Sequence, residues 1–211
     1  MRSEQGPETS LRSHWEAIFA SRDPKQVSWY QREAGDSLEL IEKLGVAPEA
    51  PVIDVGGGES RLVDGLLPRG FSDVSVLDIS ERALSMARER LGPEQAVTWL
   101  HEDLLQWRPP RTYALWHDRA VFHFFTKEDH RQRYLEVLKR ATAPGGHVII
   151  ATFAPEGPDH CSNLPVSRYN PQDLAQMLGA DYDPLIMQHR EHVTPGGAVQ
   201  PFSWLAARRR G

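Results

Sequence analysis

The sequence predicts an α/β fold in which helices cover both faces of a doubly wound, mostly parallel seven-stranded sheet. Short apolar runs alternate with amphipathic stretches between residues 51 and 153, which is typical of parallel sheets. The run HVIIATF is apolar throughout, as in a strand buried on both faces. Residues 183–209 instead read as two strands joined by a turn around Pro195 to Gly197. We therefore expect the last strand to be antiparallel.

The length of the chain predicts one domain. Its 211 residues are enough for one well-buried hydrophobic core but too few for two cores of adequate size. We expect a polar tail over 1–10 and a single domain over 11–207, made of a helical segment (11–45), an alternating core (51–153) and a closing part (154–207). The closing part holds a loop, a short helix begun by NPQDL, and the terminal hairpin.

The spacing of apolar residues, together with the residues that begin and end helices, predicts the individual helices and strands. Apolar spacing predicts a first helix over 11–23 that Pro24 stops, and a second one over 36–45, which Asp36 or Ser37 caps and Gly45 ends. The expected parallel strands cover 51–55, 74–78, 96–100, 113–117 and 147–153.

Two longer helices are expected between these strands. Ser80 caps the helix that Gly92 terminates. The next helix begins with Thr126 and Asp129 three residues apart, as in a variant capping box, and ends before Pro144.

Composition excludes several classes of protein. The net charge of −5 argues against a general grip on nucleic-acid phosphates, which needs clustered Lys and Arg. One cysteine, Cys161, allows no internal disulfide and no thiolate zinc site. No window is apolar enough to span a membrane, and a lone cysteine fits a reducing compartment, so we expect a soluble, cytoplasmic protein. We expect no metal, and we favour a monomer because no long apolar surface segment stands out.

The stretch VIDVGGGES places three glycines after the first strand. In doubly wound folds the first strand-to-helix turn carries glycines, and ligands bind at the carboxyl ends of the strands. Gly56 and Gly58 could let the backbone turn tightly and meet a ligand without an intervening Cβ. Asp78 ends the next strand, 20 residues past Gly58, where a carboxylate accepts hydrogen bonds from ribose hydroxyls. Together these features indicate an adenosine ligand.

The same loop disfavours a dinucleotide. The dinucleotide fingerprint needs a glycine at the sixth position, which here is Arg61. Asp54 precedes the loop, and its charge would repel a pyrophosphate but favour a cationic ligand, directly or through water. A nucleoside with a positive amino-acid tail fits both observations.

In order and spacing, these motifs resemble those of the class I, seven-strand S-adenosylmethionine-dependent methyltransferases. The resemblance covers residues 11–207: VIDVGGGES is similar to the first motif, VSVLDIS to the second, WLHEDLLQW to the third and LWHDRAVFHF to the fourth, while APGGHVII is like the turn before the fifth strand. Small enzymes of the thiopurine, tellurite-resistance and elongation-factor-lysine types are the most similar members.

The resemblance implies S-adenosylmethionine as the methyl donor and S-adenosylhomocysteine as its product. The segment 11–45 would form a lid, 51–153 the donor-binding core and 154–207 the acceptor side. Asp78 would bind the ribose, Asp103 would accept from the adenine amine, and Leu104 would flank the ring. The implied donor site comprises Trp29, Tyr30, Asp54, Gly56, Gly57, Gly58, Asp78, Ile79, Glu102, Asp103, Leu104 and His117.

An acceptor amine would have to lose a proton. His117, Asp118 and His123, in or just after the fourth motif, are the candidate catalytic residues, because a histidine near its ordinary pKa can accept a proton at neutral pH. Acceptor contacts could come from the loop and hairpin, where the candidates are Arg168, Tyr169, His192 and Gln200.

We therefore expect a methyltransferase that acts on N, S or O of a small molecule, or alternatively on protein lysine. The fourth motif reads HDRA, without the prolines and aromatic of the family's amino-methylating nucleic-acid branch, so nucleic acid is not the expected acceptor. Two hypotheses from other functional classes remain: the protein could be an NAD(P)-dependent oxidoreductase or a nucleoside-binding module without catalysis.

Overall fold

The structure is a computed structural model that describes residues 7–23, 25–93 and 96–211. Residues 1–6 of the expected tail, and Pro24, which was expected to stop the first helix, lie outside the described residues. The expected tail is nevertheless too long, because the first helix already begins at Pro7.

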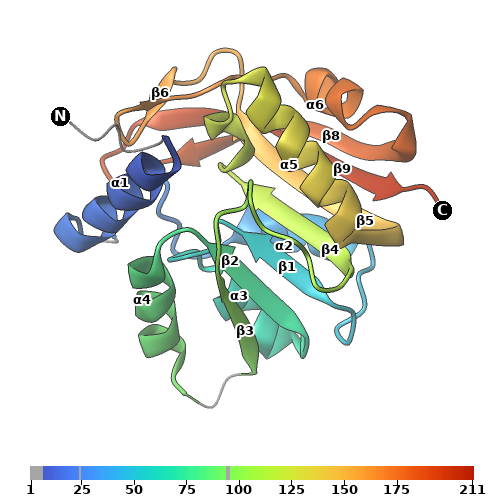
Figure 1. The fold of residues 1–211 in the computed structure, drawn as a ribbon, viewed down its shortest axis with the longest axis horizontal. Coiled ribbons are helices and arrows are strands. Elements are labelled where there is room, and N and C mark those ends of the chain that lie inside the picture. The colour runs from blue at the N-terminus through green and yellow to red at the C-terminus, as the bar shows by residue number, and fades with distance from the viewer. Residues whose placement is uncertain (1–6, 24, 94–95) are drawn as a thin grey trace, which may run out of the picture.

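A seven-stranded sheet forms the centre of the molecule (Figure 1). Its strand order is β3-β2-β1-β4-β5-β9-β8, which confirms the expected doubly wound sheet. The strands are β1 Val52–Val55, β2 Val74–Asp78, β3 Val97–His101, β4 Tyr113–Arg119, β5 Thr142–Phe153, β8 Tyr182–Val193 and β9 Val199–Arg209.

Strand directions also agree with the sequence. Strands β1 to β5 pair in parallel, while β9 lies antiparallel between β5 and β8. The last six residues of β5 are all buried, as expected for its apolar run. Because the order reverses between β1 and β4, the carboxyl ends of these strands open a crevice of the kind that binds ligands in such folds.

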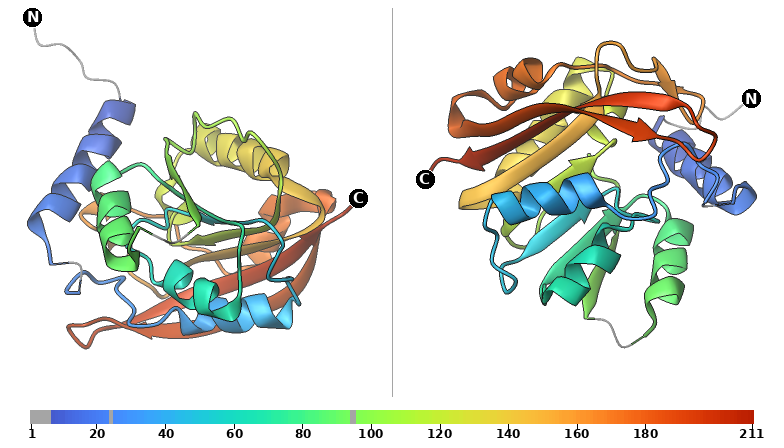
Figure 2. Two further views of the ribbon diagram at one scale, coloured as in Figure 1. Left: turned by 90° about the horizontal axis from the view of Figure 1, so that it is seen from below. Right: turned by 180° about the vertical axis from the view of Figure 1, so that it is seen from behind.

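Helices cover both faces of the sheet. One face packs on α5 and α6, and the other on α2, α3 and α4, while α1 stands at the border of the domain beside α4 (Figure 2). The helices are α1 Pro7–Ser21, α2 Gly35–Lys43, α3 Leu62–Leu66, α4 Glu81–Leu91, α5 Glu128–Ala141 and α6 Pro171–Leu178. Three single-turn 3-10 helices are η1 Leu67–Arg69, η2 Phe122–Phe124 and η3 Gly179–Asp181.

The helix ends confirm some of the expected caps. The Ser80 hydroxyl accepts from the Ala83 N–H at the start of α4. At α6, Asn170 and Asp173 form a reciprocal capping box. Gly45, just past α2, takes a left-handed φ of 63°, which glycine adopts without steric cost.

Two other expected caps are wrong. Helix α2 starts after Ala34 with no side-chain cap, since the Ser37 hydroxyl bonds to His117 instead. Helix α5 starts after Lys127, also without a side-chain cap, so Thr126 and Asp129 form no capping box. The loop before α6 also holds an unexpected small hairpin, β6 His160–Cys161 and β7 Leu164–Pro165.

Candidate active site

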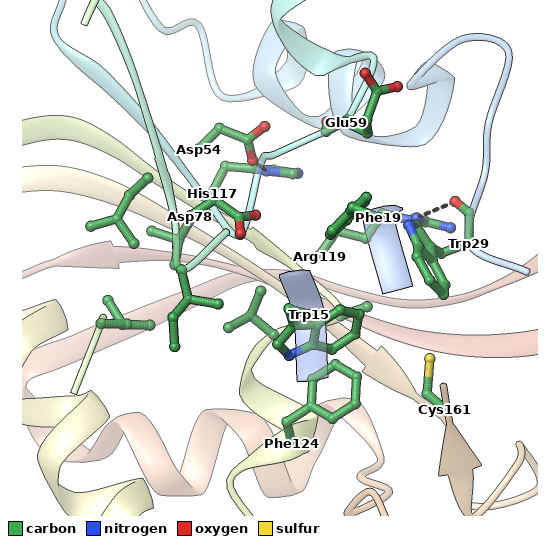
Figure 3. A pocket seen from close by; sticks show the side chains of 18 of the residues that line it. Trp15, Phe19, Trp29, Asp54, Glu59, Asp78, His117, Arg119, Phe124 and Cys161 are labelled. Atoms are coloured by element: carbon green, nitrogen blue, oxygen red, sulfur yellow. Dashed lines mark hydrogen bonds and ion pairs between the residues drawn. The ribbon is translucent and has the colours of Figure 1, made fainter. Parts of the chain in front are cut away.

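A pocket opens at the carboxyl ends of β1, β2 and β4, beside the turn that follows β3, and α1 and residues 27–31 close its outer side. Residues of the first four motifs and of the N-terminal segment therefore meet in one place. Its polar lining residues include Ser37, Asp54, Glu59, Asp78, Glu102, Asp103, His117 and Arg119. Ten of the lining side chains are labelled in Figure 3.

The glycine loop brings the backbone of one residue to this pocket. Gly56 lines it and has a left-handed φ of 64°. A Cβ there would lie 2.1 Å from Cγ2 of Val121, so no other residue fits without a shift of that side chain. The turn is therefore built for glycine.

Gly57 and Gly58 serve a different purpose from the one expected. Neither is among the residues that line the pocket. A Cβ on Gly57 would lie 2.5 Å from Oδ2 of Asp54, and one on Gly58 would lie 2.6 Å from Oδ2 of Asp78. The missing side chains thus leave room for two buried carboxylates, and of the three glycines expected at the donor only Gly56 lines the pocket.

Asp78 ends β2 with its carboxylate in the pocket. Its Oδ1 accepts from the Ser80 N–H at 2.8 Å. Burial raises the pKa of this carboxyl to about 7, against the lowering effect of the Ser80 and Gly58 backbone donors. A buried carboxylate of this kind is ready to accept further hydrogen bonds from a ligand, since these would stabilise its charge.

Asp54, His117 and Ser37 form a buried chain of hydrogen bonds in the same pocket. His117 Nδ1 lies 2.7 Å from Asp54 Oδ1, and His117 Nε2 lies 2.9 Å from the Ser37 hydroxyl. The other carboxylate oxygen of Asp54 is buried without a hydrogen-bond partner. Such an oxygen can accept from a donor group on a ligand.

The residues expected beside the adenine also line the pocket. Ile79, Glu102, Asp103 and Leu104 all line the pocket. The Asp103 carboxylate accepts from the Leu105 N–H at 3.0 Å, which fixes its orientation at the start of the turn after β3.

Helix α1 covers the pocket with its apolar face. Leu11, Trp15 and Phe19 line it from this helix. Two hydrogen bonds attach α1 to the first turn of α4: the Glu81 N–H donates to Glu16 at 2.7 Å, and Arg82 Nε donates to the Phe19 carbonyl at 3.0 Å. Trp29 and Tyr30, expected in a lid, also line the pocket.

The structure does not bring Asp118 into the pocket lining. Its carboxylate accepts from the N–H groups of Val121 and Phe122 and from the Tyr134 hydroxyl, the last at 2.7 Å. Burial raises the pKa of this carboxyl to about 6, and the Tyr134 hydrogen bond opposes that rise. Successive side chains of a strand point to opposite faces, so Asp118 faces α5 while His117 faces the pocket. This corrects the expected placement of Asp118.

His123 is likewise absent from the pocket lining. Its ring packs against Phe124 and Phe153, with centroids 4.5 and 4.8 Å away. Both ring nitrogens are buried without a partner. Burial, reinforced by Arg119, lowers the pKa of this histidine to about 3, so it stays neutral at physiological pH. Its expected placement at the site is corrected in the same way.

The expected acceptor contacts also lie elsewhere. Arg168 and Tyr169 border a separate hollow beside α5 and α6, and Arg168 donates to the Gly157 carbonyl. His192 bonds to the Ser28 carbonyl at 2.7 Å. His192 and Gln200 are outside the described lining of the pocket.

Sequence reasoning missed several lining residues. They are Trp15, Phe19, Ser37, Glu59, Arg119, Phe124 and Cys161. Trp15 and Phe19 belong to the segment expected to form a lid, although they were not named as site residues. Arg119 could also have been found, because it stands two positions after His117 on the same strand and therefore shares its face.

Comparison with known proteins agrees with this geometry. Residues 52–146 match the sequence model of a family described as a methyltransferase domain. A methyltransferase from Anabaena variabilis, S-adenosylmethionine-dependent by its description, superimposes with a TM-score of 0.75 at 16% identity, over 100% of this chain and 98% of that one. This chain has the class I methyltransferase fold.

Another methyltransferase of this fold has been solved with ligands. The Burkholderia thailandensis 1,6-didemethyltoxoflavin-N1-methyltransferase, with bound 1,6-didemethyltoxoflavin and S-adenosylhomocysteine, matches with a TM-score of 0.73 at 19% identity, over 100% of this chain and 94% of that one.

The relatives found by sequence are longer than this chain. The eEF1A lysine and N-terminal methyltransferase of Mus musculus is 29% identical over 67% of this chain and 21% of its own length. A malonyl-[acyl-carrier protein] O-methyltransferase of Ilyobacter polytropus is 27% identical over 58% of this chain and 45% of its own length. The matched regions thus span about a fifth to a half of the relatives' length.

Among the helices in the described parts of the chain, none is long and apolar enough to cross a membrane.

Replacing Asp118 with alanine is expected to lower the free energy of unfolding by about 2–4 kcal/mol, since two buried donors and one partly buried donor lose their acceptor. Urea unfolding monitored by circular dichroism measures this. D118N keeps an acceptor oxygen and is expected to lose about 1 kcal/mol or less. Wild-type stability in D118A would contradict the structural role of this carboxylate.

Proposed function

We propose that this protein is an S-adenosylmethionine-dependent methyltransferase that methylates N, S or O of a small molecule. The observation that carries the proposal is the position of Asp78. It is a buried carboxylate at the end of β2, in a pocket at the point where the strand order of the class I methyltransferase fold reverses. A carboxylate at this place is suited to ribose hydroxyls.

The residues present fit this donor. Asp78 would accept from the ribose, and Glu102, Asp103 and Leu104 would surround the adenine. The unpartnered oxygen of Asp54 would accept from the ammonium group of the methionine part, directly or through water. When bound, S-adenosylmethionine supplies an electrophilic methyl group on a cationic sulfur.

The protein would then have to align the acceptor and exclude water. Positioning of two reactants can contribute several kcal/mol, on the order of 7–11 in well-oriented systems. The walls of Trp15, Phe19, Trp29 and Phe124 suit this role, because their apolar surface removes water from the reacting atoms.

A proton from the acceptor would leave through the chain of Ser37, His117 and Asp54. The Ser37 hydroxyl lines the pocket and bonds to His117 Nε2, while Asp54 holds Nδ1. A carboxylate on one ring nitrogen fixes the tautomer and makes the other nitrogen a better proton acceptor. His117 therefore remains our candidate base, without Asp118 and His123.

The second candidate acceptor is a protein lysine, because the Mus musculus relative is an eEF1A lysine and N-terminal methyltransferase. The cover that α1 forms over the pocket favours a small molecule. Incubation with donor radiolabelled in the methyl group, plus fractionated extract, would decide: label in metabolites supports the proposal, and label on protein supports the lysine alternative.

Donor binding is expected to depend on Asp78. Calorimetry should show that the protein binds S-adenosylmethionine and S-adenosylhomocysteine but not NAD, and that D78A weakens both by at least about tenfold, since the ribose loses a charged acceptor. Binding of NAD without a response to the sulfur nucleosides would reject the proposed function.

Donor affinity is also expected to rise with pH. The pKa of Asp78 is raised to about 7, and hydrogen bonds from ribose hydroxyls favour the ionised form. Binding below pH 7 therefore requires loss of a proton, so the Kd of S-adenosylhomocysteine should fall by up to about tenfold per pH unit between pH 5.5 and 7 and then level off. D78N should remove this component of the pH profile. An identical profile in wild type and D78N would contradict the assignment.

Removing the Ser37 hydroxyl tests the proton path. S37A is expected to lower kcat by about 10- to 100-fold for an acceptor that must lose a proton, with little change in donor Kd. S85A, which removes a hydroxyl on the outer part of α4, serves as the control. Unchanged kcat in S37A would exclude Ser37 from the path.

A further inference from the structure

Arg119 lines the pocket, and one edge of its guanidinium group has no hydrogen-bond partner. One nitrogen, Nη1, donates to the Trp29 carbonyl at 3.2 Å, and the face of the group lies over Phe202, 4.9 Å from its centroid. The other two nitrogens, Nε and Nη2, are buried without a hydrogen-bond partner. These two form one side of the planar group, the edge that binds both oxygens of a carboxylate.

No acid neutralises this side chain within the described residues. Arg119 takes part in no ion pair there, although Asp36 and Asp54 attract it from farther away. Burial lowers the pKa of Arg119 to about 10, so the group stays charged at neutral pH. A buried, unpaired charge is costly. An anion that enters the pocket would remove this cost.

The other arginine of the pocket lining also has one buried nitrogen, Nε, without a hydrogen-bond partner, but an acid neutralises its charge. Arg61 is paired with Asp64 at 3.1 Å. Arg90, from α4, holds the same loop through Glu59 at 2.9 Å and Asp64 at 2.8 Å. These cations have partners within the chain, so the free charge of the pocket is concentrated on Arg119.

The position of Arg119 favours the acceptor over the donor as the source of the anion. Figure 3 shows Asp54, His117 and Asp78 on one side of the pocket, while Arg119 reaches toward Trp29 on the other. Asp54 and Asp78, which are proposed above to bind the donor, lie on the first side. Aromatic rings of Trp15, Phe19 and Trp29 meet around the second, with centroids 5.9 to 6.3 Å apart.

We propose that the methyl acceptor is a small organic acid with a flat apolar body, whose carboxylate binds to Nε and Nη2 of Arg119. The aromatic side chains around the guanidinium would hold the body of this acid. This inference deepens the proposed function. It rests on that function only in identifying the bound acid as the methyl acceptor. The binding of an organic acid itself does not depend on catalysis.

Aromatic acids paired with their neutral amides test the proposal. Benzoate, 2-naphthoate and indole-3-acetate, each beside its amide, would be titrated by calorimetry into the protein with and without S-adenosylhomocysteine. Wild type should bind at least one acid tenfold or more tighter than its amide. R119Q should reduce this ratio to below threefold, R119K should retain part of it, and the Kd of S-adenosylhomocysteine should change less than threefold in both.

R168Q is the matched control, since Arg168 lies outside the pocket lining, and it should keep the wild-type ratio. Circular dichroism would establish that each variant is folded. The proposal is overturned if wild type shows no preference for any acid, or if R119Q weakens S-adenosylhomocysteine tenfold and leaves the acid preference unchanged, because the anion would then be the donor's carboxylate. Failure of wild type to bind any sulfur nucleoside would reject the proposed function instead, and the acid preference measured without donor would still test Arg119.

Discussion

The hydrogen bond between Asp54 and His117 joins the two strands on which the site depends. The residues are register partners on β1 and β4, the strands between which the order of the sheet reverses. Their side chains are 2% and 3% exposed and their atoms lie 2.7 Å apart. Through Ser37 the same interaction reaches α2. A polar contact at this depth fixes the geometry of the crevice, because its loss would leave the buried Asp54 carboxylate without a hydrogen bond.

The glycine loop is shaped by the same constraint. Two carboxylates, Asp54 and Asp78, lie directly beneath Gly57 and Gly58. The loop can pass over them because those residues have no side chains, and Gly56 can then turn toward the pocket. Arg90 and Glu59 hold the loop from its far side. The glycines thus accommodate the protein's own acids as much as they admit a ligand.

Much of the fold could be predicted from the sequence, because the spacing of apolar residues and the residues that begin or end helices are local features of the chain. The parallel strands, the antiparallel β9, the cap at Ser80 and the short helix begun by NPQDL followed from residues close together in the chain. The cap expected from Ser37 was wrong because His117, eighty positions away, competes for its hydroxyl. Such competition between distant groups leaves no local pattern.

Motif order also predicted most of the residues that line the proposed donor side of the pocket, whereas the residues expected to contact the acceptor lie elsewhere. Asp118 and Arg119 show why. Alternation along β4 turns Asp118 toward Tyr134 and leaves Arg119 in the pocket, and the nature of each environment depends on helices from other parts of the chain. His123 sits in an aromatic enclosure formed by Phe124 and Phe153, whose second wall comes from β5.

Helix α1 supplies a wall of the pocket but belongs to neither core cluster of the sheet. Its attachment to α4 is made through Glu16 and Arg82. The binding free energy of a ligand that contacts Trp15 and Phe19 would be thermodynamically linked to the docking free energy of α1. Any ligand that gains from these contacts favours the docked helix by the same amount. The position of α1 at the entrance of the pocket would therefore depend in part on the ligand that the pocket binds.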